Sequence, residues 1–126
     1  FVEHYQKHQV IWNGDNGRTI FYQSELPYDP PTQEQWMDGD TNGYASYLVA
    51  PHVKRHEATA LGVYSFFNAG QPIVETSAIK VPVGPQVKIR HAVAVFLAGS
   101  GEISHVVNDQ GAAANAASYI SYLPGN

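Results

Sequence analysis

The sequence predicts an all-β protein, because short apolar runs recur along it, turn residues separate these runs, and helical periodicity is scarce. The runs are rich in β-branched and aromatic residues and follow one another at short, fairly even intervals over 126 residues. Gly, Pro, Asn and Asp stand between them. This pattern is typical of all-β architectures. Periodicity alone leaves a sandwich, a barrel and a β-helix open.

Individual strands are expected where the apolar runs are longest. A strand at residues 9–12 is followed by two Asn-Gly pairs in 13–17, which supply the positive φ angles of a tight reversal before a strand at 19–23. Further strands are predicted at 43–49, 58–67, 78–81, 87–89, 92–97, 103–107 and 119–122. Residues 99–101 predict a turn between strands. One or two helical turns are expected at 31–37, because Pro31 is tolerated in a first helical turn and Gly39 ends the segment.

The composition indicates one globular domain, over residues 1–126, and excludes several classes of protein. Seven Lys and Arg against eleven Asp and Glu give a net charge of −4, so no basic stripe is present to bind nucleic acid. No apolar run approaches the roughly 20 residues of a membrane helix. The absence of Cys excludes disulfides and cysteine-ligated metals. Because the chain begins at Phe1 without a signal peptide, we expect a mature processed protein or a piece of a longer one.

Two pairs of histidines are spaced four residues apart, His4 with His8 and His52 with His56. On a helix this spacing can bind a metal, but neither segment has a helical pattern. We interpret these histidines as polar, hydrogen-bonding side chains, and we expect no metal and no other cofactor.

Aromatic side chains next to amides and carboxylates indicate a carbohydrate surface, since rings stack on the C–H faces of sugars while polar groups bond the hydroxyls. The alternative is that most of these rings belong to the core. Glu25 lies between Tyr22, Leu26 and Tyr28. An apolar or aromatic setting raises the pKa of a carboxyl group that protonates a leaving glycosidic oxygen. The alternative for Glu25 is a solvated glutamate at the end of a strand.

Residues 3–6 and 12–31 resemble the C-terminal part of glycoside hydrolase family 55, the secreted β-1,3-glucanases and glucan 1,3-β-glucosidases. The resemblance continues through residues 36–37, 43–44, 61–67 and 101–108, so it covers essentially the whole chain. It implies the closing strands and last coils of a right-handed parallel β-helix, in an extracellular enzyme built from two such helices with the cleft between them. A β-sandwich is the alternative fold.

The resemblance also implies a reaction and a set of site residues. The reaction is the inverting, exo-acting hydrolysis of β-1,3-glucan, with Glu25 as the general acid and Glu3 as a second catalytic carboxylate that helps to orient the attacking water. Substrate-binding neighbours are expected among Tyr22, Gln23, Tyr28 and Trp36.

The coil period is left open by two competing offsets. Glu3 and Glu25 are separated by 22 residues, about one coil, which would place both carboxylates on one face of neighbouring strands. Tyr5-Gln6 repeats as Tyr22-Gln23, however, with an offset of 17 residues.

Two further interpretations stay open, a small sugar-binding lectin without catalysis and an inert domain that caps a β-helix. The expected partners are β-1,3-glucan or another glycan, together with the N-terminal part of the enzyme or further copies of the chain. No nucleic acid or membrane partner is expected. Because the first β-helix is not part of these residues, we expect the chain alone to be inactive on glucan.

Overall fold

The computed structural model describes residues 1–125, which form strands and turns without any helix. It follows that no helix in this part of the chain has the length or apolarity to cross a membrane. The strands are β1 (Val2–Glu3), β2 (Val10–Trp12), β3 (Gly17–Glu25), β4 (Met37–Asp38), β5 (Thr41–Asn42), β6 (Tyr47–Val49), β7 (His56–Phe67), β8 (Val74–Lys80), β9 (Val87–Gly99), β10 (Glu102–Val107) and β11 (Ile120–Gly125).

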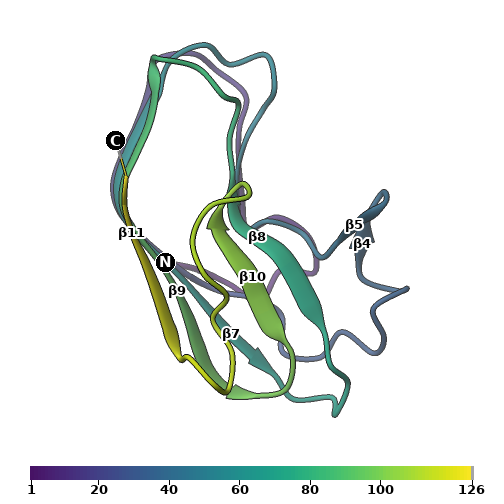
Figure 1. Cartoon of the computed structure of the whole chain (residues 1–126). Coiled ribbons are helices and arrows are strands. Elements are labelled where there is room, and N and C mark those ends of the chain that lie inside the picture. Colours follow the sequence, from purple (N-terminus) through teal and green to yellow (C-terminus); the bar gives the residue numbers. More distant parts are fainter. Residues whose placement is uncertain (126) are drawn as a thin grey trace.

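Most of the strands belong to two sheets. One sheet has the order β1-β3-β7-β9-β11 and the other β10-β8-β6-β2, while β4 and β5 form a separate hairpin. In Figure 1, β7, β9 and β11 lie together on one side of the molecule, β8 and β10 lie on the other, and the β4–β5 hairpin projects outward.

The chain passes back and forth between the two sheets. β1 is followed by β2, β3 by β6 after the β4–β5 hairpin, β7 by β8 and β9 by β10, so each passage adds one strand to each of the two sheets. Neighbours pair in parallel throughout, except that the last strand, β11, is antiparallel to β9. Parallel neighbours require a crossover connection, which the opposite sheet supplies here. The all-β prediction is confirmed, and its parallel sheets are consistent with a β-helix rather than with an antiparallel sandwich.

Several predicted elements have different boundaries or roles in the structure. Residues 87–89 and 92–97 are two halves of the single strand β9. The loop at 13–17 is not a hairpin, because it connects β2 in one sheet to β3 in the other. The helical turns expected at 31–37 were wrong: the segment makes one turn, closed by Trp36 N–H to Gln33 O at 3.0 Å, and enters β4 at Met37. Burial of the Trp36 ring in the core outweighs the local helical preference.

Three residues with positive φ stand at the same level in neighbouring strands of the five-stranded sheet. They are Phe21 in β3, Ala60 in β7 and His91 in β9, with φ of 63°, 63° and 55°. The pairs on both sides of them stay in register from β3 to β9. Such angles are uncommon for residues other than glycine. Their alignment shows that all three strands bend at one level.

The bend also changes which side chains of each strand face the core. In β9, Val87 and Ile89 are buried before His91, whereas Ala92 and Ala94 are buried after it. The alternation of a strand has a period of two, so one left-handed residue shifts it by one position. Beyond the bend, Ser24, Val63 and Ala94 are paired across the three strands and buried. The residue that follows each of them in its strand is partly exposed.

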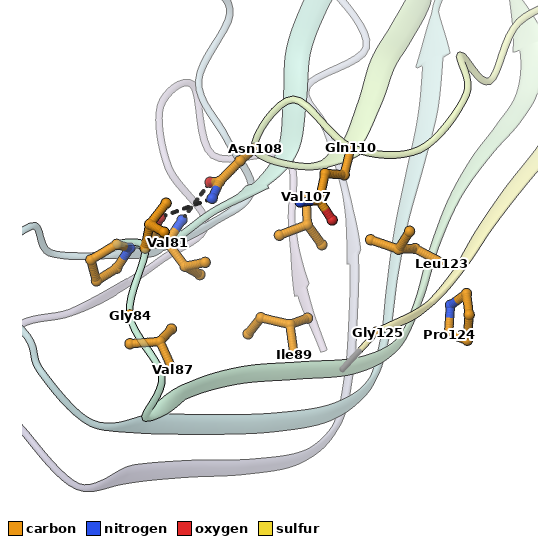
Figure 2. Close-up of a pocket in the computed structure, with 12 residues that line it drawn as sticks. Val81, Gly84, Val87, Ile89, Val107, Asn108, Gln110, Leu123, Pro124 and Gly125 are labelled. Carbon is orange, nitrogen blue, oxygen red and sulfur yellow. Dashed lines mark hydrogen bonds between the residues drawn. The ribbon is translucent and has the colours of Figure 1, made fainter.

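A clamp at the end of β10 holds the loop between β8 and β9. The Val81 N–H donates to Asn108 Oδ1 at 2.9 Å, and Asn108 Nδ2 donates to the Val81 carbonyl at 3.1 Å. Figure 2 shows both bonds beside a cavity of about 270 Å³ lined by apolar side chains, among them Val87, Ile89 and Leu123. The amide thus takes the place of a neighbouring strand and keeps the loop closed over the cavity.

Removal of this clamp should lower the stability of the protein. We expect Asn108→Gly to lose about 2 kcal/mol of unfolding free energy, because two hydrogen bonds disappear while glycine tolerates the φ of 52°. Asn16→Gly is the matched control, since Asn16 has a φ of 61° and its side chain is exposed. Urea unfolding of the two variants tests the expectation, and equal losses in both would contradict it.

Candidate active site

The two carboxylates predicted from the sequence lie on neighbouring strands. β1 and β3 pair in parallel with Glu3 opposite Glu25, so the 22-residue offset is the register of the sheet and the 17-residue offset is not. Paired residues of adjacent strands point to the same side, and the strands are about 4.8 Å apart. Glu3 is exposed and Glu25 is half-buried. The structure therefore brings both carboxylates to one face.

Glu25 is held by two side chains from different segments. The Tyr28 hydroxyl donates a hydrogen bond to Glu25 Oε2, and His4 Nε2 lies 3.1 Å from the same oxygen. His4 reaches this position because it follows β1 directly, where its backbone N–H bonds the Glu25 carbonyl at 3.0 Å. Both side-chain contacts are made to Oε2, which leaves Oε1 as the carboxyl oxygen that can meet a ligand.

These contacts lower the pKa of Glu25 from its usual value. The Tyr28 hydrogen bond has the largest effect and His4 adds to it, while partial burial acts in the opposite direction. The sequence interpretation of a carboxyl group with a raised pKa is thus corrected for this chain. Tyr22 and Leu26 are buried, so they do not surround the carboxyl group, and Tyr28 contributes a donor rather than an apolar wall.

Tyr28 is itself fixed in place and stays neutral. Its ring packs between His4, at a centroid distance of 4.2 Å, and Phe66, at 5.1 Å. The hydrogen bond to Glu25 is the main cause that raises the pKa of Tyr28 to about 12, and the charge of Glu3 contributes in the same direction. Tyr28 is therefore a permanent donor to the carboxylate at ordinary pH.

The remaining predicted neighbours divide between the exposed face and the core. Gln23 precedes Glu25 by two residues on β3 and is partly exposed on the same face. Tyr22 and Trp36 are only 7% and 3% exposed. The Tyr22 hydroxyl bonds Ser46 Oγ at 2.8 Å, and Trp36 Nε1 donates to the Gln6 carbonyl at 2.8 Å. The structure does not bring these two rings to the face of Glu25, because their polar ends are satisfied inside the protein.

Three residues near the acid were not among the predicted site residues. His4 was considered for its spacing to His8, and Tyr64 and Phe66 lie in the predicted strand at 58–67. Tyr64 pairs with Glu25 in register, and the Leu26 N–H bonds the Tyr64 carbonyl at 2.9 Å. The 22-residue offset was the signal for His4, since it places the residue after Glu3 beside Glu25. No sequence signal fixed the register of β7.

The histidines have separate partners, and among residues 1–125 no three His, Asp, Glu or Cys side chains are grouped to hold a metal. His8 Nδ1 lies 2.7 Å from the Ala45 carbonyl, and His52 Nε2 lies 2.7 Å from the Asn13 carbonyl. His56 is buried and contacts the Tyr47 hydroxyl at 2.7 Å. Each of these three histidines thus has its own partner, a backbone carbonyl for His8 and His52 and a hydroxyl for His56.

Two large cavities lie away from Glu25. One of about 550 Å³ lies between the β4–β5 hairpin and strands β8 and β10, and another of about 550 Å³ lies between loops 51–54 and 82–87. Neither of these, nor the cavity of Figure 2, is lined by Glu3 or Glu25. The face that carries both carboxylates is open in this chain.

A second acidic group is buried in the wall of the first of these cavities. Glu75 on β8 is 1% exposed, and burial raises its pKa well above the usual value. The Ser77 N–H donates to Oε1 at 3.2 Å, while Oε2 has no hydrogen-bond partner and lies against Gly43. A side chain at position 43 would collide with this oxygen. Burial therefore favours the neutral form of Glu75, and this residue takes no part in the Glu25 face.

Comparisons with known proteins point to one kind of relative. Residues 1–25, which contain β1, β2, β3 and both carboxylates, match a family model described as the LAM55 pectate lyase-like domain. Over 111 residues the chain is 44% identical to an exo-beta-1,3-glucanase of Streptomyces sp. (strain SirexAA-E / ActE), an alignment that covers 88% of this chain and 18% of that protein.

Two solved structures have the same fold as this chain. The structure of sacteLam55A from Streptomyces sp. SirexAA-E matches 98% of the chain with a TM-score of 0.94 and 39% identity. A variant of the same protein, in complex with glucose, matches 98% with a TM-score of 0.93 and 38% identity. The chain spans less than a quarter of the length of these relatives. The matches confirm the resemblance that the residues around Glu3 and Glu25 carry.

The hydrogen bond from Tyr28 can be tested through the titration of Glu25. Tyr28→Phe removes the donor that stabilises the carboxylate, so we expect the pKa of Glu25 to rise. His4→Gln should raise it less, because His4 has the smaller effect. The carboxyl ¹³C chemical shift of Glu25, followed against pH, measures both changes. An unchanged pKa in Tyr28→Phe would show that the bond does not form in solution.

The buried acid should make stability depend on pH. The folded-state pKa of Glu75 lies above the unfolded value, so its neutral form is fully accommodated below the unfolded pKa. Stability is then lost as the pH rises from about 4.3 toward the folded pKa. We expect Glu75→Gln to match the wild type near pH 4 and to have the higher Tm at pH 7. The exposed Glu57→Gln is the control, and a Tm difference for Glu75→Gln that is constant with pH would refute the expectation.

Proposed function

We propose that this chain, a part of a glycoside hydrolase of family 55, carries the general acid of an enzyme that hydrolyses β-1,3-glucan. The observation that carries the proposal is the register that sets Glu3 beside Glu25 on one open face. The exo-beta-1,3-glucanase at 44% identity supports the choice of substrate, and the glucose complex of the related protein supports a sugar ligand.

In the proposed mechanism Glu25 protonates the leaving group. Its protonated carboxyl group donates the proton to the glycosidic oxygen as the bond from that oxygen to the anomeric carbon breaks. A water molecule forms the new bond to the anomeric carbon from the opposite side of the sugar ring, so the configuration is inverted. The water releases its proton to a carboxylate base. Glu3 helps to orient this water. Inverting enzymes hold their carboxyl groups roughly 6.5–9.5 Å apart, which side chains of adjacent strands can reach.

Tyr28 and His4 act as positioning residues for the acid. They bind Oε2, so the oxygen that carries the transferred proton is Oε1. A general acid must be protonated at its working pH, whereas these two contacts lower the pKa of Glu25 while water has access to it. Bound glucan and an opposing wall would remove that water, and desolvation raises the pKa of a carboxyl group. We therefore infer that catalysis requires a closed cleft and that this chain alone is inactive.

The proposed frame for the site is the last part of a right-handed parallel β-helix that β11 closes. The proposed setting is outside the cell, since a charged fraction of 14% and an aromatic fraction of 12% suit a glycan surface. A lectin without catalysis is not favoured, because the relative at 44% identity is a glucanase. Partners remain part of the proposal, namely β-1,3-glucan and either the rest of the enzyme or another copy of the chain.

Substitution of the acid is the direct test. In the native protein that contains this chain, we expect Glu25→Gln to lower laminarin hydrolysis about 10²–10⁴-fold, because glutamine cannot donate the proton. Glu34→Gln, an exposed glutamate in the turn before β4, is the matched control and should keep full activity. Release of glucose is the measurement. Full activity of Glu25→Gln would remove the assignment of the acid, and binding of laminarin without hydrolysis by the wild type would indicate a sugar-binding protein instead.

A further inference from the structure

We propose that the outer face of the five-stranded sheet is a binding track for the part of a glucan chain that extends away from Glu25. Tyr64 lies next to the acid on this track, and Tyr122 is a stacking platform at its far end. The inference rests on the proposed function, and it assigns a site for sugars beyond the one that is cleaved.

The track begins with a row of residues in register with the acid. Glu25 pairs with Tyr64, Tyr64 with Val95, and Val95 with Ile120. Paired residues point to the same side of a sheet, so this row runs straight from the acid across β7 and β9 to β11. At about 4.8 Å per strand, it extends roughly 14 Å from Glu25. The labels in Figure 1 show β7, β9 and β11 in this order.

A second row of paired residues runs parallel to the first, and its side chains rise little above the sheet. It joins Gln23, Gly62, Val93 and Tyr122 in register. A Cβ atom on Gly62 would lie 3.0 Å from Tyr64 Cε2 and 3.3 Å from the Tyr64 hydroxyl. The Tyr64 ring therefore lies down over the glycine instead of standing away from the sheet. Together with the half-buried Val93, this leaves a shallow, mainly apolar strip between the acid and β11.

An oriented ring stands at the far end of the strip. Tyr122 is 57% exposed, and its hydroxyl is 2.6 Å from His91 Nδ1. The rings of Tyr122 and His91 are nearly parallel, at 17°, with centroids 6.2 Å apart. His91 is the left-handed residue at the bend of β9, so its position is set by the backbone. An exposed ring that is fixed by its polar end suits the C–H face and hydroxyls of a sugar.

The occupant follows from the continuity of this strip with the acid. An exo-acting hydrolase cleaves at the end of a chain, so the remaining sugars must leave the acid along an adjoining surface. The strip starts at Glu25 without interruption, and beyond Gln23 and the acid it is lined by glycine, valine, isoleucine and tyrosine. A neutral polysaccharide fits such a surface better than a charged ligand does.

Dependence of binding on chain length tests the track. In the Glu25→Gln form of the native protein, dissociation constants for laminaribiose and laminarihexaose are measured by calorimetry. We expect Tyr122→Ala to weaken the hexaose roughly five- to tenfold, since one stacked sugar is lost, and to change the biose by less than about twofold. Tyr122→Phe keeps the ring but loses the bond to His91, so its effect on the hexaose should be intermediate.

Tyr119→Ala is the matched control for this experiment. Tyr119 is 61% exposed but stacks on the buried Phe96, so it lies outside both rows. It should leave both dissociation constants unchanged. The track is refuted if Tyr122→Ala alters neither ligand or weakens both equally, or if Tyr119→Ala has the same effect. None of these results tests the proposed function, which is refuted separately if Glu25→Gln still hydrolyses laminarin.

Discussion

The parallel register of the five-stranded sheet is the constraint on which the other features depend. It aligns Phe21, Ala60 and His91, so that three strands bend at one level and shift their alternation together. A single strand out of register would expose its apolar row and bury its polar row, because the side-chain period is two. The same register that fills the core therefore also decides which side chains meet on the outer face.

Core and candidate site are one residue apart along the same strand. Ser24 is fully buried and contacts Ser46, whereas Glu25 is turned to the open face beside Glu3. The tyrosines are divided in the same way. Tyr22 forms a hydrogen bond with Ser46 in the core, and Tyr28 forms one with Glu25 on the open face. Tyr22 belongs to the buried row of β3, whereas Tyr28 lies in the loop after β3, so placement and not residue type separates the structural tyrosine from the one that bonds the acid.

The electrostatics of the two unusual glutamates have opposite causes. Glu25 is partly exposed and receives hydrogen bonds, so its pKa is lowered. Glu75 is fully buried, and this desolvation raises its pKa although backbone N–H groups donate hydrogen bonds to it. If the acid of the proposed reaction must be protonated, the chain does not supply that condition by itself. It supplies the position of the carboxyl group, and the proposed function assigns the desolvation to bound glucan and an opposing wall.

The sequence by itself determined the all-β class and the approximate strands, and it left two offsets open, of which the structure selected the one that pairs Glu3 with Glu25. Strands are local patterns, and the motif around both glutamates is long enough to be distinctive. Only the tertiary structure decided that Tyr22 and Trp36 are buried, that residues 31–37 form no helix, and that Tyr64 and Tyr122 share the face of Glu25. These outcomes depend on the register between strands whose paired residues are 25 to 39 residues apart in the sequence. Packing of the core by side chains from all strands selects that register, and a short stretch of sequence does not carry this information.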